Sequence, residues 1–318
     1  MTTFILFWTL ITSIILAIST SSMFSLWICL EVNMMMFIPL MNSKNSLSSN
    51  SMMLYFIVQS LASSIFIFSF FLLTIFPNLN HFMIFFMMSS ILIKLGAAPF
   101  HIWFPQISEG LSFPSFTILI LIQKIIPLYI LTFLNNIFVM TTIILSSIIG
   151  SLGGWNQNSL RKIIAFSSIS HLAWMISIMI SKSNWWLIYF FTYSFIILSL
   201  LLILYLNNLS FISQIIKLTN PLQKTMLIIS LMSLGGMPPL LGFFMKWMSI
   251  KIISSFFPLI LIFLIPSSLF NLFFYSRVLY PLFLKIMIKN HNPTKSKIPF
   301  TLMISSQCLT LFFLIPLS

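Results

Sequence analysis

The sequence predicts an all-α membrane protein with eleven transmembrane helices, arranged as two inverted five-helix repeats and a C-terminal helix. Of its 318 residues, 59% are hydrophobic and 5% are charged, whereas a soluble domain carries about 25% charged residues. With a mean hydropathy of +1.12, the chain has too few polar residues to cover the surface of a soluble protein. Lipid offers no hydrogen bonds to the backbone, so spanning segments must be helices or strands of a closed barrel. The apolar stretches are long and lack the alternation of barrel strands, which favours helices.

Eleven apolar stretches lie between polar or proline-marked breaks, and most are near the length of about 20 residues that crosses a bilayer. They run over 3–19, 23–41, 52–76, 82–104, 115–134, 137–153, 160–181, 185–206, 223–249, 252–278 and 299–317. The fourth stretch is interrupted by Gly96 and Pro99, and the ninth by the segment SLGGMPPLLGF at 233–243. Proline removes a backbone donor and clashes with the preceding turn. Both helices are therefore expected to break at membrane depth, where freed carbonyls are tolerated only inside protein or beside water.

The positions of the two breaks predict an internal repeat. Broken helices at corresponding places in two halves are typical of transporter binding sites, and here each break falls in the fourth helix of five. An ordinary proline kink would explain either break alone, but not the matched positions. We expect a first repeat over 1–134, a second, inverted repeat over 137–280, and a loop with the last transmembrane helix over 281–318.

The basic residues orient the chain. With the loops assigned alternately to two sides, nine lysines and arginines fall on the side of the N-terminus, and only Lys182 and Lys251 on the other. Cations resist translocation, so the N-terminal side faces the negative compartment. Abundant Phe, Met, Ile, Ser, Asn and Lys indicate an A/T-rich genome of the mitochondrial kind, and the N-terminus shows no targeting segment. We expect a multi-pass protein of the mitochondrial inner membrane, with its N-terminus in the matrix and its C-terminus in the intermembrane space.

Four charged residues fall inside apolar stretches, where no loop explains them: Glu31, Lys94, Lys124 and Lys246. A charge at the centre of a spanning helix costs about 2.5–3.5 kcal/mol or more. A lysine–glutamate pair could simply join two helices, but one carboxylate cannot neutralise three lysines. An amine removed from water holds its proton less tightly, so these residues are predicted to relay protons. Lys246 lies nearer a helix end, and its amine could instead reach the membrane surface.

Other polar residues give weaker signals. His171 stands among serines in SSISHLAWM, where an imidazole could shuttle protons along water or simply bond to a neighbouring helix. His101 follows the first break and could lie on the same path, whereas Glu109 is expected to cap a helix or face water. Cys29 and Cys308 form no CxxC pair. Neither a metal site nor a GxGxxG or Walker pattern is present in the sequence, so no cofactor or metal is expected on this chain.

Five stretches carry a family resemblance: WICLEVNMMMFIPLM, IKLGAAPFHIWFP, GLSFPSFTILILIQKIIPL, GGWNQNSLRKIIAFSSISHLAWM and SLGGMPPLLGFFMKW. They are similar to the NADH dehydrogenase (ubiquinone) subunit 2 family, the mitochondrial antiporter-like subunits of respiratory complex I. The resemblance covers residues 23–250 in order, and the rest agrees in length and hydropathy only.

The resemblance implies proton translocation coupled to electron transfer in other subunits. Glu31 resembles the family's membrane glutamate, which is thought to tune the lysine on the first broken helix, here Lys94. Lys124 resembles the central connecting lysine, and Lys246 the lysine on the second broken helix, near the next subunit. His171 fits the HLxW stretch. The implied partners are other complex I membrane subunits, neighbouring antiporter-like subunits among them, and membrane lipids, with no nucleic acid. NADH, FMN, iron–sulfur clusters and ubiquinone would be bound by other subunits.

Two other functions remain open on the residues alone. A stand-alone cation/proton antiporter would need acidic residues to bind its cation, and Glu31 is the single acidic residue inside an apolar stretch. A structural subunit that bridges its neighbours would tolerate joint replacement of Lys94, Lys124 and Glu31 by apolar residues.

Overall fold

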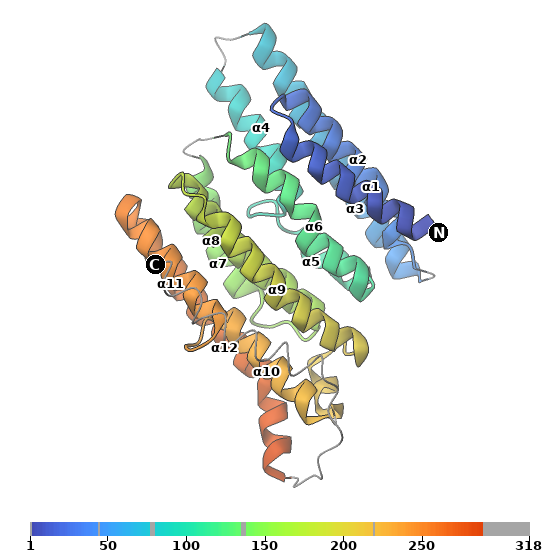
Figure 1. Ribbon diagram of the computed structural model, residues 1–318, viewed down its shortest axis with the longest axis vertical. Coiled ribbons are helices and arrows are strands. Elements are labelled where there is room, and N and C mark those ends of the chain that lie inside the picture. The colour runs from blue at the N-terminus through green and yellow to red at the C-terminus, as the bar shows by residue number, and fades with distance from the viewer. Residues whose placement is uncertain (1, 44, 77–79, 135–137, 219, 289–318) are drawn as a thin grey trace. The chain divides into compact units, whose positions relative to one another are not determined.

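The computed structural model describes residues 2–43, 45–76, 80–134, 138–218 and 220–288. Within these ranges every named element is a helix (Figure 1), which confirms the all-α prediction. The chain divides into two compact units, Met1–Ser146 and Ser147–Ser318. The predicted division into repeats at 1–134, 137–280 and 281–318 stays a prediction.

The first unit contains six helices and the start of a seventh. These are α1 (Thr2–Ser19), α2 (Met23–Met41), α3 (Ser46–Ile75), α4 (Asn80–Leu95), α5 (Trp103–Gly110), α6 (Phe113–Leu131) and α7 (Phe138–Gly153). The long helix α3 packs against α2, α4 and α5, while α6 packs against α1, α2 and α4. Fully buried aromatic side chains fill the space between them: Phe37, Tyr55, Phe66, Phe104 and Phe116.

The second unit is built around α8 (Leu160–Ile180). Its other elements are α9 (Trp185–Leu206), the 3-10 helix η2 (Ile212–Lys217), α10 (Pro221–Gly235), α11 (Leu241–Phe256) and α12 (Pro258–Ile288). Nearly all residues of α8 are buried, and α9, α11 and α12 all pack against this helix. A helix covered on all sides in this way places its polar residues inside protein. The serines and His171 of α8 are therefore buried.

The two predicted breaks have the same local structure. Gly96 (φ 68°) directly follows α4 and Gly236 (φ 84°) directly follows α10, and both lie in the left-handed region that glycine enters without a steric penalty. At the first break, the Ala97 and Gly96 amides donate to the Leu92 and Ile93 carbonyls. At the second, Met237 and Gly236 donate to Met232 and Ser233 in the same pattern. Both helices thus end in a Schellman motif, and a proline follows each left-handed glycine after three residues.

Most predicted spans match the helices within a few residues, but several boundaries are wrong. The helix predicted from 52 begins at Ser46, and α5 continues to Gly110, beyond the predicted end at 104. The helix predicted to end at 278 continues to Ile288, into the segment expected to be a loop.

Within the described part of the chain, six helices are long and apolar enough to cross a membrane, and three shorter ones are also apolar. The predicted gap between residues 249 and 252 is wrong, because α11 continues to Phe256 and α12 begins at Pro258. Proline is well suited to the first position of a helix, whereas Lys251 lies exposed on α11 and marks no loop. The stretch 299–317 lies outside the described residues, so the count of eleven stays a prediction.

Candidate functional site

Lys94 and Lys124 line the same cavity, although thirty residues separate them in the sequence. Lys94 precedes the first break on α4, and Lys124 lies in the middle of α6. Both side chains are buried, with 7% and 2% of their surface exposed. The cavity measures about 10 Å³, which is room for a single water molecule. Tyr55, Gln59 and Gln123 contribute polar groups to its wall.

A chain of buried hydrogen bonds surrounds this cavity. The Tyr55 hydroxyl donates to Gln123 Oε1 over 3.2 Å, and Gln123 Nε2 donates to Asn33 Oδ1 over 3.0 Å. These contacts join α2, α3 and α6. The sequence analysis did not single out these three residues. A usable signal was present, because isolated amide side chains inside apolar spans are costly and need partners.

Side chains also satisfy the carbonyls freed by the first break. The Trp103 indole donates from Nε1 to the Ile93 carbonyl over 3.0 Å. Gln59 Nε2 donates to the Lys94 carbonyl over 3.4 Å. The backbone beside Lys94 is thereby held by groups from α5 and α3, which leaves the lysine side chain on the cavity wall.

Electrostatic neighbours stabilise the two amines differently. Glu31 on α2 is half-buried, and its carboxylate is the charge that acts on Lys94. Lys124 lies with its Nζ 4.7 Å from the centre of the Phe104 ring, a cation–π distance. Lys94 and Lys124 are thus brought to one cavity in the first unit, and Glu31 on α2 acts on Lys94 through its charge.

Lys246 closes the second break. Its Nζ donates to the Gly235 carbonyl over 2.7 Å, and its side chain lies against Gly236. Only 7% of its surface is exposed. The amine therefore faces the break of α10 inside the protein.

His171 joins a buried group of hydroxyls in the second unit. Its Nδ1 lies 2.9 Å from the Tyr189 hydroxyl on α9, and its ring lies 4.9 Å from that of Tyr193. The sequence suggested two roles for His171, a hydrogen bond to a neighbouring helix or a proton shuttle. The hydrogen bond to α9 is present, and a role in proton transfer stays a prediction. Asn271 on α12 donates from Nδ2 to the Ser170 hydroxyl over 2.7 Å.

The tyrosines around His171 were missed by sequence reasoning. The hydroxyls of Tyr193 on α9 and Tyr275 on α12 are buried and have no hydrogen-bond partner among the described residues. All three tyrosines of this group, Tyr189, Tyr193 and Tyr275, are buried. Aromatic residues in apolar helices normally indicate packing, so the sequence carries little sign of this polar role.

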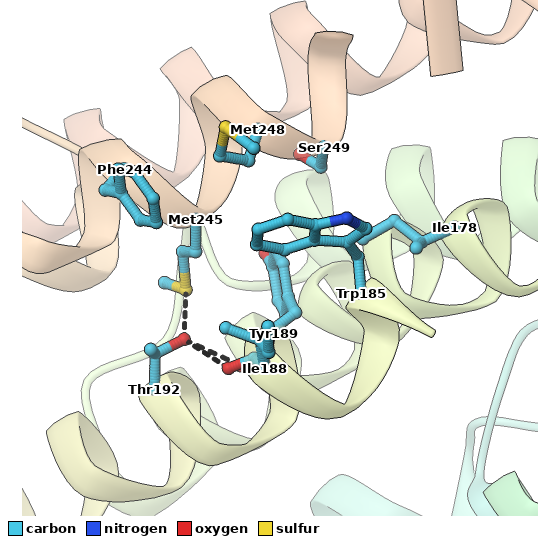
Figure 2. Close-up of a pocket in the computed structure, with 9 residues that line it drawn as sticks. All are labelled: Ile178, Trp185, Ile188, Tyr189, Thr192, Phe244, Met245, Met248 and Ser249. Carbon is cyan, nitrogen blue, oxygen red and sulfur yellow. Dashed lines mark hydrogen bonds between the residues drawn. The ribbon is translucent and has the colours of Figure 1, made fainter. Parts of the chain in front are cut away.

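A second small cavity lies between Tyr189 and the helix of Lys246. Figure 2 shows the Trp185 indole lying between Ser249 of α11 and Tyr189 of α9. The cavity has about 10 Å³ of space, again the room of one water molecule. Thr192 Oγ1 donates to the Met245 sulfur over 3.5 Å, and the Ser249 hydroxyl donates to the Lys246 carbonyl over 2.6 Å. The cavity thus places Tyr189, the partner of His171, beside the α11 segment that follows Lys246.

The remaining sequence candidates lie apart from these groups. His101 is half-buried, with its Nδ1 3.2 Å from the Pro99 carbonyl. Glu109 is exposed near the end of α5, as expected for a helix cap or a solvated side chain. Cys29 is buried on α2, and Cys308 lies outside the described residues. Among the described residues, no group of three or more His, Cys, Asp or Glu side chains could hold a metal ion.

Comparisons with known proteins identify relatives over most of the chain. Residues 20–271 match a family described as "NADH:quinone oxidoreductase/Mrp antiporter, TM". NADH-ubiquinone oxidoreductase chain 2 of Anopheles gambiae is 43% identical over 88% of this chain and 86% of the relative. The protein of the same name from Aedes aegypti is 42% identical over 90% and 87%.

The fold is also known from solved structures. A chain of respiratory complex I from Thermus thermophilus superposes with a TM-score of 0.84 at 18% identity, covering 99% of this chain and 79% of that one. At this identity the likeness establishes the fold. The family match and the sequence relatives establish the family: the chain belongs to the NADH-ubiquinone oxidoreductase chain 2 family.

Proposed function

We propose that this chain is a membrane subunit of the proton-translocating NADH:ubiquinone oxidoreductase, and that it carries part of the proton path. Family membership supports the place in the complex. The observation that carries the proton path is the cavity shared by Lys94 and Lys124, because two buried amines on different helices face one water-sized space.

In the first unit, a water molecule in that cavity would accept a proton from one lysine and pass it to the other. Glu31 sets the direction. When its charge acts on Lys94, the ammonium is stabilised; when the interaction weakens, Lys94 releases its proton toward Lys124. Moving one charge against 100 mV costs about 2.3 kcal/mol, and a change of two units in the pKa of an amine corresponds to about 2.7 kcal/mol. A modest rearrangement around Glu31 is therefore large enough to drive the step.

In the second unit, the proton would pass through the hydroxyl group around His171 to Lys246. The hydrogen bond between His171 and Tyr189, the cavity behind Tyr189, and Ser249 support this order. Lys246 would hold the proton in its contact with the Gly235 carbonyl and release it when the second break changes shape.

The repeats and the orientation belong to the same proposal. The two matching Schellman motifs support an inverted repeat with a break in each fourth helix. The basic residues beside the N-terminal side support a matrix-facing N-terminus in the mitochondrial inner membrane. The electron carriers NADH, FMN, iron–sulfur clusters and ubiquinone would be bound by other subunits, because this sequence offers no set of redox ligands.

Replacing Lys124 with methionine in the assembled complex tests the proposal. Methionine fills similar space without a titratable group. We expect the proton-to-electron ratio in proteoliposomes to fall to half or less, while the complex still assembles. Lys251→Met is the matched control, because Lys251 is exposed on α11. A normal ratio in Lys124→Met would refute the relay, and proton-coupled cation exchange by the isolated chain would favour a stand-alone antiporter.

A further inference from the structure

A cavity much larger than the two beside the lysines opens at one end of the second unit. It measures about 590 Å³ and is lined by Asn158, Phe211, Ile212, Ser213 and Arg277. The lining comes from the loop before α8, from the region of η2, and from α12. Sites for small ligands measure about 300–1,000 Å³. This cavity therefore has room for a polar group far larger than one water molecule, and the proton path has no use for it.

Arg277 is fixed at the wall of this cavity. Its Nη2 donates to the Gln157 carbonyl in the loop before α8. Its Nε is buried and has no hydrogen-bond partner among the described residues. A guanidinium presents five donors in a planar fork that matches the oxygens of a phosphate. One bond to the backbone holds the fork in place, and donors remain for an acceptor in the cavity.

Further positive charge gathers along the same segments. Arg161 and Lys162 stand in the first turn of α8, three and four residues after the lining residue Asn158, and Lys217 ends η2. The N-terminus of α8 adds the positive end of its helix dipole. These groups together favour an anion at this end of the unit.

The negative charge must come from outside this unit. The two acidic residues of the chain, Glu31 and Glu109, both belong to Met1–Ser146, so residues 147–318 contain no Asp or Glu. Two of the lining residues are apolar, Phe211 and Ile212, and Phe211 is 50% exposed. A ligand that fits both features carries a phosphate beside a hydrocarbon part.

We propose that this cavity binds the phosphodiester headgroup of an anionic membrane lipid. The oxygens of the phosphate accept from the Arg277 guanidinium, and the glycerol and first acyl carbons lie against Phe211 and Ile212. Basic pockets at the ends of membrane helices bind such headgroups. Inorganic phosphate shares the acceptor chemistry but leaves these two apolar residues uncovered, and an acidic segment of a neighbouring subunit is the competing occupant.

Lipid retention by the purified complex tests this proposal. The complex is placed in bilayers of phosphatidylglycerol and phosphatidylcholine in varied ratio, and the lipid that survives detergent washing is counted by mass spectrometry. Arg277→Gln is expected to lower the affinity for phosphatidylglycerol by about tenfold or more, the effect of one charge-assisted contact. Arg277→Lys keeps the charge without the fork and is expected to lose less. Lys251→Gln, on exposed α11, is the control and is expected to retain lipid as the unchanged complex does.

Other outcomes separate the competing occupants. If excess inorganic phosphate replaces phosphatidylglycerol and fills the cavity to the same extent, the cavity is a phosphate site. That result would overturn the lipid assignment. Unchanged lipid retention in Arg277→Gln, together with loss of a neighbouring subunit, would show a protein partner instead. If Arg277→Gln does not assemble, the unchanged complex and Arg277→Lys still decide, because the proposal requires a preference for phosphatidylglycerol over phosphatidylcholine that weakens in the lysine variant.

Discussion

Replacing Gly236 with alanine is expected to weaken the second helix break and displace Lys246. Gly236 has a φ of 84°, and a left-handed conformation costs a residue with a side chain about 1–2 kcal/mol. The new Cβ would also lie 2.8 Å from Lys246 Cδ and 3.1 Å from its Nζ. The lysine must move, and its bond to the Gly235 carbonyl contributes about 1–3 kcal/mol. Together these effects are expected to destabilise the folded chain around the second break by about 2–5 kcal/mol.

The neighbouring glycine supplies the control for this experiment. A Cβ added at Gly235 would lie 3.5 Å from Leu272 Cγ, which is ordinary contact, and alanine is favoured over glycine in a helix by roughly 0.5–1 kcal/mol. The assay is the half-life of NADH:ubiquinone oxidoreductase activity at elevated temperature, read together with the proton-to-electron ratio. We expect Gly236→Ala to shorten the half-life and lower the ratio, and Gly235→Ala to leave the ratio unchanged without shortening the half-life. Equal half-lives and normal ratios in both variants would refute the reasoning.

Three further substitutions test single contacts. Tyr189→Phe removes the hydroxyl beside His171 and should lower the proton-to-electron ratio with normal assembly, whereas Tyr205→Phe, exposed on α9, should leave the ratio unchanged; equal ratios would count against the path. Trp103→Phe removes the donor to a carbonyl at the first break and should destabilise the complex by about 1–3 kcal/mol, measured as a shorter half-life at elevated temperature. Gln123→Leu breaks the bonds to Tyr55 and Asn33 and should slow proton pumping more than electron transfer; equal slowing would point to a general structural defect.

Much of the fold followed from the sequence, because lipid restricts the chain to helices and charge is costly in it. Composition predicted the all-α class, and glycine with proline marked both breaks correctly. Helix ends were predicted less well, since α12 continues to Ile288 beyond the expected end at 278. At 249–252 the charge of Lys251 was taken as a loop signal. A lysine on an exposed helix face and a lysine in a loop look the same in sequence. The structure distinguishes them, because α11 continues past Lys251 and the next helix begins at Pro258.

The site was predictable in its charges but not in its contacts. The depth of Glu31, Lys94 and Lys124 in apolar spans identified them without any structure. Their common surroundings depend on how α2, α4 and α6 are rotated about their axes, and hydrophobic residues on all sides of these helices give no preferred face. For the same reason the sequence did not indicate that Lys246 bonds to the carbonyl of Gly235.

The central claim is that Lys94 and Lys124 act as consecutive members of one proton path. The most direct measurement compares the proton-to-electron ratio in complexes carrying Lys94→Met, Lys124→Met and both substitutions. When residues act as a unit, the effects of replacing them do not add. The double variant should therefore have the same proton-to-electron ratio as the worse of the two single variants. A further loss in the double variant, equal to the sum of the single losses, or a normal ratio in either single variant, would contradict the account.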